Sequence, residues 1–173
     1  MLSLHLEISK SLEELSQSDL DRTPSYDNQY DDATSVIMDL CDILEEEGIV
    51  CFRVKGFGQD SWPVDVAIDL SSILEQLLEV IDSIHKENYP CGLNFYEQGI
   101  ERKLVFENSD RLVKISCYSR TSWVPSPNLI LESKKYILSM FINLKTSFVE
   151  VANKVCPQLS ASDLFITWCK HLV

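Results

Sequence analysis

The densest group of polar side chains in the sequence comprises Glu97, Gln98, Glu101 and Arg102. Carboxyl groups beside a guanidinium are the side chains that general acid–base catalysis uses, and a deep pocket that shifts their pKa values would make them the noncontiguous site of a small enzyme. In the alternative interpretation the group is structural: Gly99 bends the chain, and Arg102 pairs with a neighbouring carboxylate to fix a sheet. The sequence favours the structural role.

No other set of residues completes a catalytic or cofactor-binding motif. Gly56-Phe57-Gly58 is too short for a phosphate-binding loop and is typical of a turn. Asp65 and Asp69 fall on one face of an expected strand, about 13 Å apart at roughly 3.3 Å per residue. That separation exceeds the roughly 5–9.5 Å between the carboxyl groups of a glycosidase. Cys51 has no histidine within 30 residues to activate it. We therefore expect neither an enzyme nor a bound cofactor.

The cysteines and histidines do not predict a metal site. Six widely spaced cysteines include no CxxC pair, and Cys169 with His171 lacks a second pair at zinc-site spacing. The first residues contain neither the basic region nor the long apolar stretch of a secretory signal. Most of the cysteines sit in apolar patterns, where they behave as small hydrophobic residues. We expect six reduced thiols in a cytoplasmic protein.

The negative charge is concentrated in the N-terminal third. The 173-residue chain has a net charge of -12, and residues 1–50 hold 13 acidic against 2 basic side chains. Such a surface repels nucleic acid and anionic membranes but attracts basic proteins. The expected partner-binding acids are Asp27, Asp31 and Asp32 in a loop, and Asp39, Asp42, Glu45, Glu46 and Glu47 on a helix. The alternative is a generic interaction adaptor whose acidic face and loop serve only solubility.

The helix that carries the second group ends in three glutamates. Thr34 or Ser35 can cap its start, and Gly48 ends it after Glu47. Acidic side chains at the negative end of a helix dipole cost roughly 0.3–1 kcal/mol each at low salt. Helix stability alone would favour lysine there, so the glutamates favour a role in binding.

Two tryptophans stand close to prolines at the ends of expected strands. Trp62 precedes Pro63, and Trp123 lies two residues before Pro125. Either could be a recognition anchor, because Trp is enriched at binding hot spots. The alternative for each is packing under a loop.

Short strands and amphipathic helices position these residues. Alternation predicts strands at 1–8, 49–57, 62–70, 93–97, 101–107 and 111–119, and helical spacing predicts helices at 34–47, 72–85, 131–155 and from 160 onward. Ser72 and Glu75 form a capping box for the second helix. This order predicts an α+β fold: an antiparallel sheet of about five to six strands with helices packed mainly on one face. We expect a single domain over residues 1–173, with an exposed and mobile acidic loop at 16–33.

Several short stretches carry a resemblance to a known class of proteins. They are Phe57-Gly58-Gln59, Trp62-Pro63-Val64-Asp65-Val66, the segment from Phe95 to Arg102, and Ser119 with Trp123. Together with the general layout of residues 50–130, they resemble immunity proteins of bacterial polymorphic toxin and contact-dependent growth inhibition systems. The resemblance implies a small cytoplasmic protein that binds a cognate toxin domain, in many cases a basic nuclease, and blocks its active site. No individual binding residue carries over from it.

Overall fold

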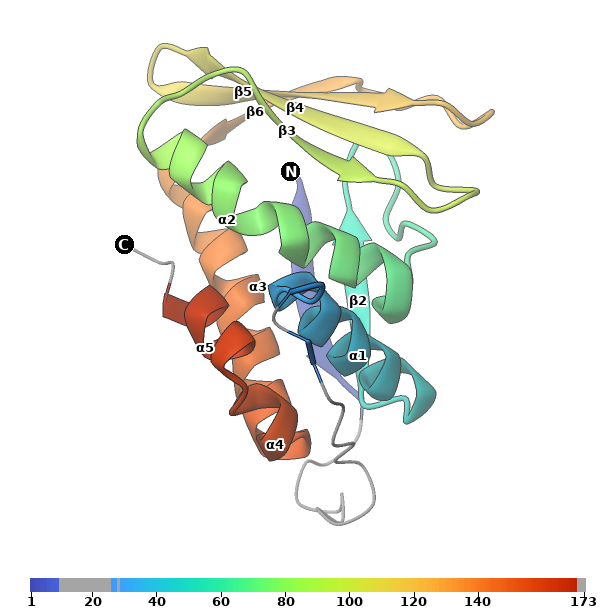
Figure 1. Cartoon of the computed structure of the whole chain (residues 1–173). Helices are drawn as coiled ribbons and strands as arrows, with labels where there is room; N and C mark the ends of the chain where they lie inside the picture. The colour runs from blue at the N-terminus through green and yellow to red at the C-terminus, as the bar shows by residue number, and fades with distance from the viewer. Residues whose placement is uncertain (10–25, 28, 171–173) are drawn as a thin grey trace.

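The computed structural model describes residues 1–9, 26–27 and 29–170, so most of the loop predicted at 16–33 lies outside the described residues, as does His171. The described chain forms an α+β fold, as predicted (Figure 1). Its elements are β1 (Ser3–Ile8), α1 (Ala33–Glu46), β2 (Val50–Lys55), the π-helical turn η1 (Val66–Leu70), α2 (Ser71–His85), β3 (Cys91–Phe95), β4 (Arg102–Ser109), β5 (Leu112–Ser119), β6 (Leu129–Ser133), α3 (Lys134–Val155), α4 (Pro157–Ser160) and α5 (Asp163–Lys170).

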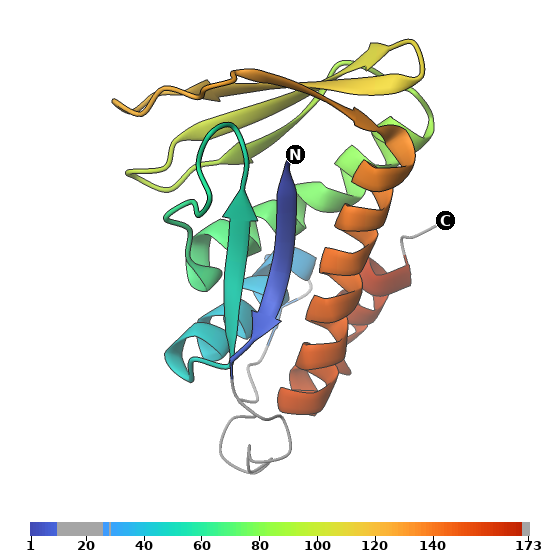
Figure 2. The same cartoon turned by 180° about the vertical axis from the view of Figure 1, so that it is seen from behind.

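The larger of two sheets is an antiparallel meander in the order β3-β4-β5-β6. The helices lie on one side of it, and no described element covers its other face (Figures 1 and 2). Side chains alternate across the sheet accordingly: Leu104 and Phe106 of β4 are buried, whereas Lys103 between Arg102 and Leu104 is exposed. The sheet therefore has one packed face and one open face.

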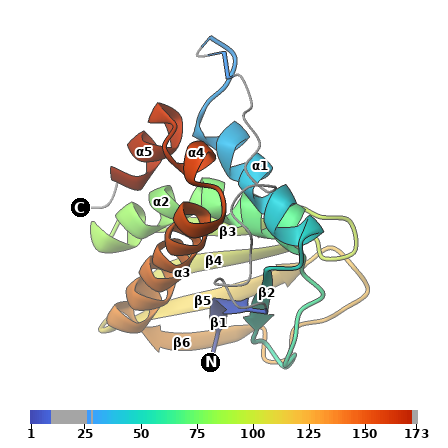
Figure 3. The same cartoon turned by 90° about the horizontal axis from the view of Figure 1, so that it is seen from below.

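The expected single sheet is in fact two sheets. β1 and β2 form a separate antiparallel pair, which lies below the larger sheet and beside α3 (Figure 3). The Tyr136 hydroxyl of α3 donates a hydrogen bond to the Leu2 carbonyl at 2.8 Å and ties this pair to the helix. Buried side chains from both sheets and from the helices form one hydrophobic cluster, so the two sheets share a core.

The alternating segment 62–70 is not a strand, in contrast to the prediction. The Asp65 carboxylate caps η1 by accepting hydrogen bonds from two backbone N–H groups of that turn, at 2.8 and 2.9 Å. η1 continues directly into α2, so Ser72 and Glu75 do not start that helix as a capping box. Free N–H groups at a helix start need acceptors, and Asp65 supplies them locally, which here outweighs the alternating pattern.

The ends of α1 are partly as expected. Asp32 caps the helix, rather than Thr34 or Ser35, by accepting a hydrogen bond from a backbone N–H at 2.7 Å. The C-terminal end follows the prediction, with Glu47 at the cap position and Gly48 at φ +59° after it.

β6 is a strand that the sequence pattern does not predict. Residues 131–133 were expected in a helix, but they pair with β5, and α3 begins only at Lys134 after the Ser133 cap. The apolar residues here fit either period, and the open edge of β5 provides the hydrogen-bond partners that select the strand. None of the helices in the described part of the chain has the length and apolar character needed to cross a bilayer.

Two loops meet where Gly58 lies. The Ser126 N–H of the β5–β6 connection donates a hydrogen bond to the Phe57 carbonyl at 3.0 Å. Gly58 has φ +84°, and a Cβ atom added there would overlap the Ser126 carbonyl. Glycine is therefore required both for its backbone conformation and for the close approach of the two loops.

We predict that Gly58→Ala lowers the free energy of unfolding by about 3 kcal/mol, because it adds an overlap with backbone to the cost of a positive φ. The matched control is Gly48→Ala, which also has a positive φ but has open space around its Cβ position. It should cost only about 1 kcal/mol. Urea denaturation of both variants measures the difference, and equal losses would show that the loops do not pack as described.

Candidate functional site

The Arg102 side chain is buried between two tryptophans on the packed face of the sheet. Its guanidinium carbon lies 4.2 Å from the ring centroid of Trp62 and 3.6 Å from that of Trp123. Arg102 is 3% exposed. Stacking on aromatic faces suits the planar, weakly hydrated guanidinium and offsets part of its loss of water. The two indole rings also contact each other edge to face, with centroids 5.9 Å apart and planes inclined at 61°, so the guanidinium lies in the angle between them. We call these three side chains the cation–π cluster.

Arg102 does not pair with a carboxylate, in contrast to the structural interpretation of the sequence. No salt bridge to it exists among the described residues, and its Nε and Nη1 atoms donate no hydrogen bond there. Burial lowers the pKa of Arg102, yet an arginine keeps its charge because its ordinary pKa is so high. Contact with the two rings and attraction to the charge of Asp69, rather than a direct ion pair, stabilise this buried guanidinium.

Trp62 and Trp123 thus both pack against a buried side chain. Trp62 is 3% exposed, its ring lies edge-on to Phe95 at 5.1 Å, and its indole N–H donates a hydrogen bond to the Gly56 carbonyl. A partner cannot reach the Trp62 ring in this conformation. Trp123 is half-buried and covers Arg102 from the other side. The alternative of packing under a loop therefore holds for Trp62, whereas part of the Trp123 side chain remains exposed to solvent.

The stretches that carried the family resemblance meet at this cation–π cluster. Trp62, Arg102 and Trp123 come one from each of the segments 57–66, 95–102 and 119–123. They are 21 to 61 residues apart in the chain. The sequence analysis treated them separately, because no local pattern indicates that an arginine and two distant tryptophans stack.

Asp65 and Asp69 contact each other instead of lying at opposite ends of a strand. The Asp65 carboxylate accepts a hydrogen bond from the Asp69 N–H, and the Asp69 carboxylate accepts one from the Asp65 N–H at 3.1 Å. Asp69 is 1% exposed, and its Oδ1 atom has no hydrogen-bond partner among the described residues. The spacing of four residues between two aspartates was the signal for this turn.

Asp69 lies among other carboxylates, and it is also close enough to Arg102 for its charge to raise the pKa of that guanidinium. Burial raises the pKa of Asp69 to about 6; the hydrogen bond from the Asp65 backbone lowers it, and the charges of Asp65, Glu97 and Glu45 raise it further. These carboxylates belong to three separate parts of the chain. Tertiary structure therefore brings carboxylates from three parts of the chain close to Asp69.

Those carboxylates form one side of the molecule. Glu45 of α1 accepts a hydrogen bond from the Ala67 N–H of η1. In Figure 1 the C-terminal end of α1, η1 and the β3–β4 loop all lie at the right. We call this region the acidic edge. Its residues are Glu45, Asp65, Asp69 and Glu97, with Asp42, Glu46 and Glu47 at the end of α1.

The predicted loop acids lie elsewhere. Asp27, Asp31 and Asp32 stand at the opposite end of α1, about 20 Å from Glu46 at roughly 1.5 Å per residue. Asp31 accepts a hydrogen bond from the Asp27 N–H, and Asp32 caps the helix. Asp39, between the two ends, accepts one from the Tyr26 hydroxyl at 2.7 Å. The structure therefore divides the predicted contact surface into two regions and gives the loop acids local structural roles.

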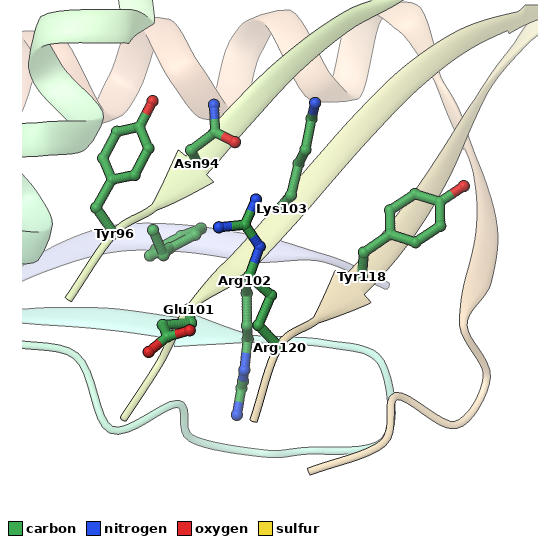
Figure 4. A pocket seen from close by; sticks show the side chains of 8 residues that line it. Asn94, Tyr96, Glu101, Arg102, Lys103, Tyr118 and Arg120 are labelled. Carbon is green, nitrogen blue, oxygen red and sulfur yellow. The ribbon is translucent and has the colours of Figure 1, made fainter. Parts of the chain in front are cut away.

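The polar group at 97–102 forms a bend, as the glycine suggested. Gly99 has φ +99°, and the Glu97 carbonyl accepts hydrogen bonds from the N–H groups of Ile100 and Glu101. Gln98 is exposed. Arg102 turns beneath the sheet, whereas Glu101 stays at the surface (Figure 4). Both residues line a shallow pocket at the strand ends but Glu97 does not, so this pocket does not bring together the three residues that the enzyme alternative needs.

Metal-ligand and thiol chemistry add no second candidate. In the part of the chain that is described, no group of three or more His, Cys, Asp or Glu side chains is placed to hold a metal ion. All six cysteines are free thiols, and four of them have a pKa raised mainly by burial, namely Cys41, Cys91, Cys117 and Cys169. Burial thus disfavours the reactive thiolate form at these four sites.

The chain was also compared with known proteins. No protein-family model, no curated protein and no solved structure matches it. Its function is therefore inferred from the geometry and charge of the acidic edge.

We predict that Arg102→Lys lowers the free energy of unfolding by about 2 kcal/mol, because a compact, strongly hydrated ammonium packs less well against aromatic rings than a planar guanidinium and still leaves a buried charge. Arg102→Met removes the charge and should cost less. The control Arg120→Lys, at an exposed position one strand away, should change stability by less than about 0.5 kcal/mol. Urea denaturation ranks the three variants, and wild-type stability in Arg102→Lys would contradict the stacking role.

A second prediction concerns pH. Because the pKa of Asp69 is raised from 3.8 to about 6 in the folded state, its contribution to stability is fully present below pH 3.8 and is lost as the pH rises through 6. Asp69→Asn removes the titrating carboxyl group and with it the loss of stability between pH 3.8 and neutral pH. The free energy of unfolding of the variant minus that of wild type should therefore increase by about 1–3 kcal/mol between acidic and neutral pH.

Thermal or urea unfolding over this pH range tests the prediction whatever the sign of the difference at low pH. The same substitution at the exposed Asp60 serves as the matched control. A pH-independent difference for Asp69→Asn would show that Asp69 is not held in the environment described.

Proposed function

We propose that this protein is an immunity factor that binds a basic toxin domain and blocks its active site. The observation that carries the proposal is the acidic edge, where carboxylates from α1, η1 and the β3–β4 loop lie together. Asp65 and Glu97 belong to the stretches that resemble immunity proteins, whereas Glu45 belongs to the acidic helix. Two separate sequence indications thus refer to neighbouring residues.

The proposed mechanism is stoichiometric occlusion without turnover. A field of negative charge speeds the encounter with a basic protein and disfavours the binding of acidic proteins. The exposed Asp42 and Glu46 would make the first contacts, and an interface of standard size, about 800 Å² per partner, would exclude substrate from the toxin. A toxin nuclease binds phosphate with basic groups, and carboxylates offer those groups an alternative anion. Such a protein acts in the cytoplasm, where its thiols stay reduced.

The test is charge reversal at the two exposed positions, Asp42→Lys with Glu46→Lys. Glu45 is left unchanged because it holds η1 through Ala67. With the C-terminal domain of the protein encoded immediately upstream as the partner, the association rate should fall about tenfold or more and its dependence on salt should weaken. Stopped-flow or surface-binding kinetics at two salt concentrations measure both effects.

The matched control reverses Glu79 and Glu150 to Lys, two exposed carboxylates on other helices. It changes the net charge equally and should alter the association rate by less than about threefold. If the two double variants slow association equally, the acidic edge is not the contact surface. If the wild-type protein neither binds this domain nor protects cells that express it, the proposed function is wrong.

A further inference from the structure

The open face of the four-stranded sheet holds a shallow pocket of about 230 Å³ near the ends of β3, β4 and β5. Asn94, Lys103 and Tyr118 are directly opposite one another on these three strands. Figure 4 shows these side chains with Tyr96 and Arg120 on one side of the sheet. Arg102 extends from the same strand end toward the packed face. Glu101 and Arg102 also line the pocket, so its inner end adjoins the cation–π cluster, while the other lining side chains shown in Figure 4 stand on the open face.

Two aromatic rings of this pocket are open to solvent. Tyr96 is 63% exposed and Tyr118 is 59% exposed. Large exposed aromatic side chains on an uncovered antiparallel sheet provide flat surfaces on which another ring can stack. A ligand with a planar ring therefore fits this part of the pocket.

Lys103 and Arg120 are two cations of this pocket without an ion pair among the described residues, although Glu101 also lines it and leaves the pocket with an excess of positive side chains. Neither Lys103 nor Arg120 forms an ion pair with a residue that the structure describes, whereas Lys114, two rows away on the same face, is paired with Glu107 at 2.9 Å. In a protein of net charge -12, two unpaired cations side by side on one face are an exception to the general sign. They fit an anionic group, and arginine in particular suits phosphate oxygens.

Asn94 is held in place beside them. The Gln76 side chain of α2 bonds both backbone groups of Asn94 and accepts a hydrogen bond from its Nδ2 atom at 3.1 Å. The Asn94 Oδ1 atom accepts no hydrogen bond from a described residue. A fixed amide with a free acceptor can read a donor on the edge of a ring.

We propose that this pocket binds a nucleotide, with its base stacked on Tyr118 or Tyr96 and its phosphate held by Lys103 and Arg120. The same chemistry is offered by a free nucleotide and by a short single strand of RNA. The net charge of the protein repels long polyanions, so it limits the ligand to a few phosphates. This site lies on a different face from the helices and does not depend on the proposed toxin binding.

The experiment titrates the full chain with AMP, adenosine, inorganic phosphate and a single-stranded RNA pentamer, followed by NMR chemical shifts and calorimetry. AMP should bind at least about tenfold more tightly than adenosine or phosphate alone, because it uses both the rings and the cations. Tighter binding of the pentamer by about tenfold would identify the strand as the source of the nucleotide, and equal or weaker binding would identify the free nucleotide.

The variant Lys103→Gln with Arg120→Gln should weaken AMP binding about tenfold, and Tyr118→Thr should weaken it about fivefold. The matched control Lys114→Gln removes a cation from the same face but outside the pocket, and should change affinity less than about twofold. All these positions are on the open face, and shift mapping on the wild-type protein locates the ligand without any substitution.

The proposal is overturned if neither AMP nor the pentamer binds at about 2 mM, if the Lys103 and Arg120 substitutions leave binding unchanged, or if phosphate or a glutamate-rich peptide binds as well as AMP. Asp42→Lys with Glu46→Lys should not reduce AMP binding, and the pocket variants should not slow association with the toxin domain. Failure of one function therefore leaves the other measurable.

Discussion

The contact of one buried guanidinium with two indole rings is the interaction on which the rest of the site depends. Arg102 begins β4, Trp62 lies between β2 and η1, and Trp123 lies between β5 and β6. The backbone N–H of Trp62 also donates a hydrogen bond to the Val54 carbonyl of β2. The cation–π cluster thus joins the segment between β2 and η1 to the start of β4 and to the β5–β6 connection of the larger sheet. Because a buried charge without an ion pair is costly, the rings must stay in contact with it, which fixes these loops.

Several carboxylates of the acidic edge occupy electrostatically unfavourable positions. Asp69 is buried among carboxylates that raise its pKa, and the acids Glu45, Glu46 and Glu47 stand at the end of α1 where the helix dipole disfavours them. Each of these arrangements loses repulsion when a positive group approaches. Glu45 also accepts the hydrogen bond from the Ala67 N–H, so this carboxylate holds η1 in place as well as adding to the negative charge of the acidic edge.

Opposite charges lie on different surfaces at the same end of the sheet. The alternation of a strand sends Arg102 to the packed face and Lys103 to the open face. On the packed side, the two tryptophans and η1 lie next to the acidic edge. On the open face, Tyr96, Tyr118, Lys103 and Arg120 line the pocket. One short segment therefore contributes to two surfaces of different chemistry, and each can be changed without the other.

The sequence by itself determined the α+β class, the strands β1 to β5, the end of α1 at Gly48 and the concentration of acid before residue 50. These features follow from short-range periodicity, turn residues and charge, which act within one element. Tertiary structure decided the helical turn at 66–70, the strand β6, the division into two sheets and the stacking of Arg102 on Trp62 and Trp123. It also separated the loop acids from the acidic edge and joined Glu97 to the latter. Such choices depend on partners tens of residues away, and a local pattern carries no information about which distant group will satisfy a hydrogen bond or cover a buried charge.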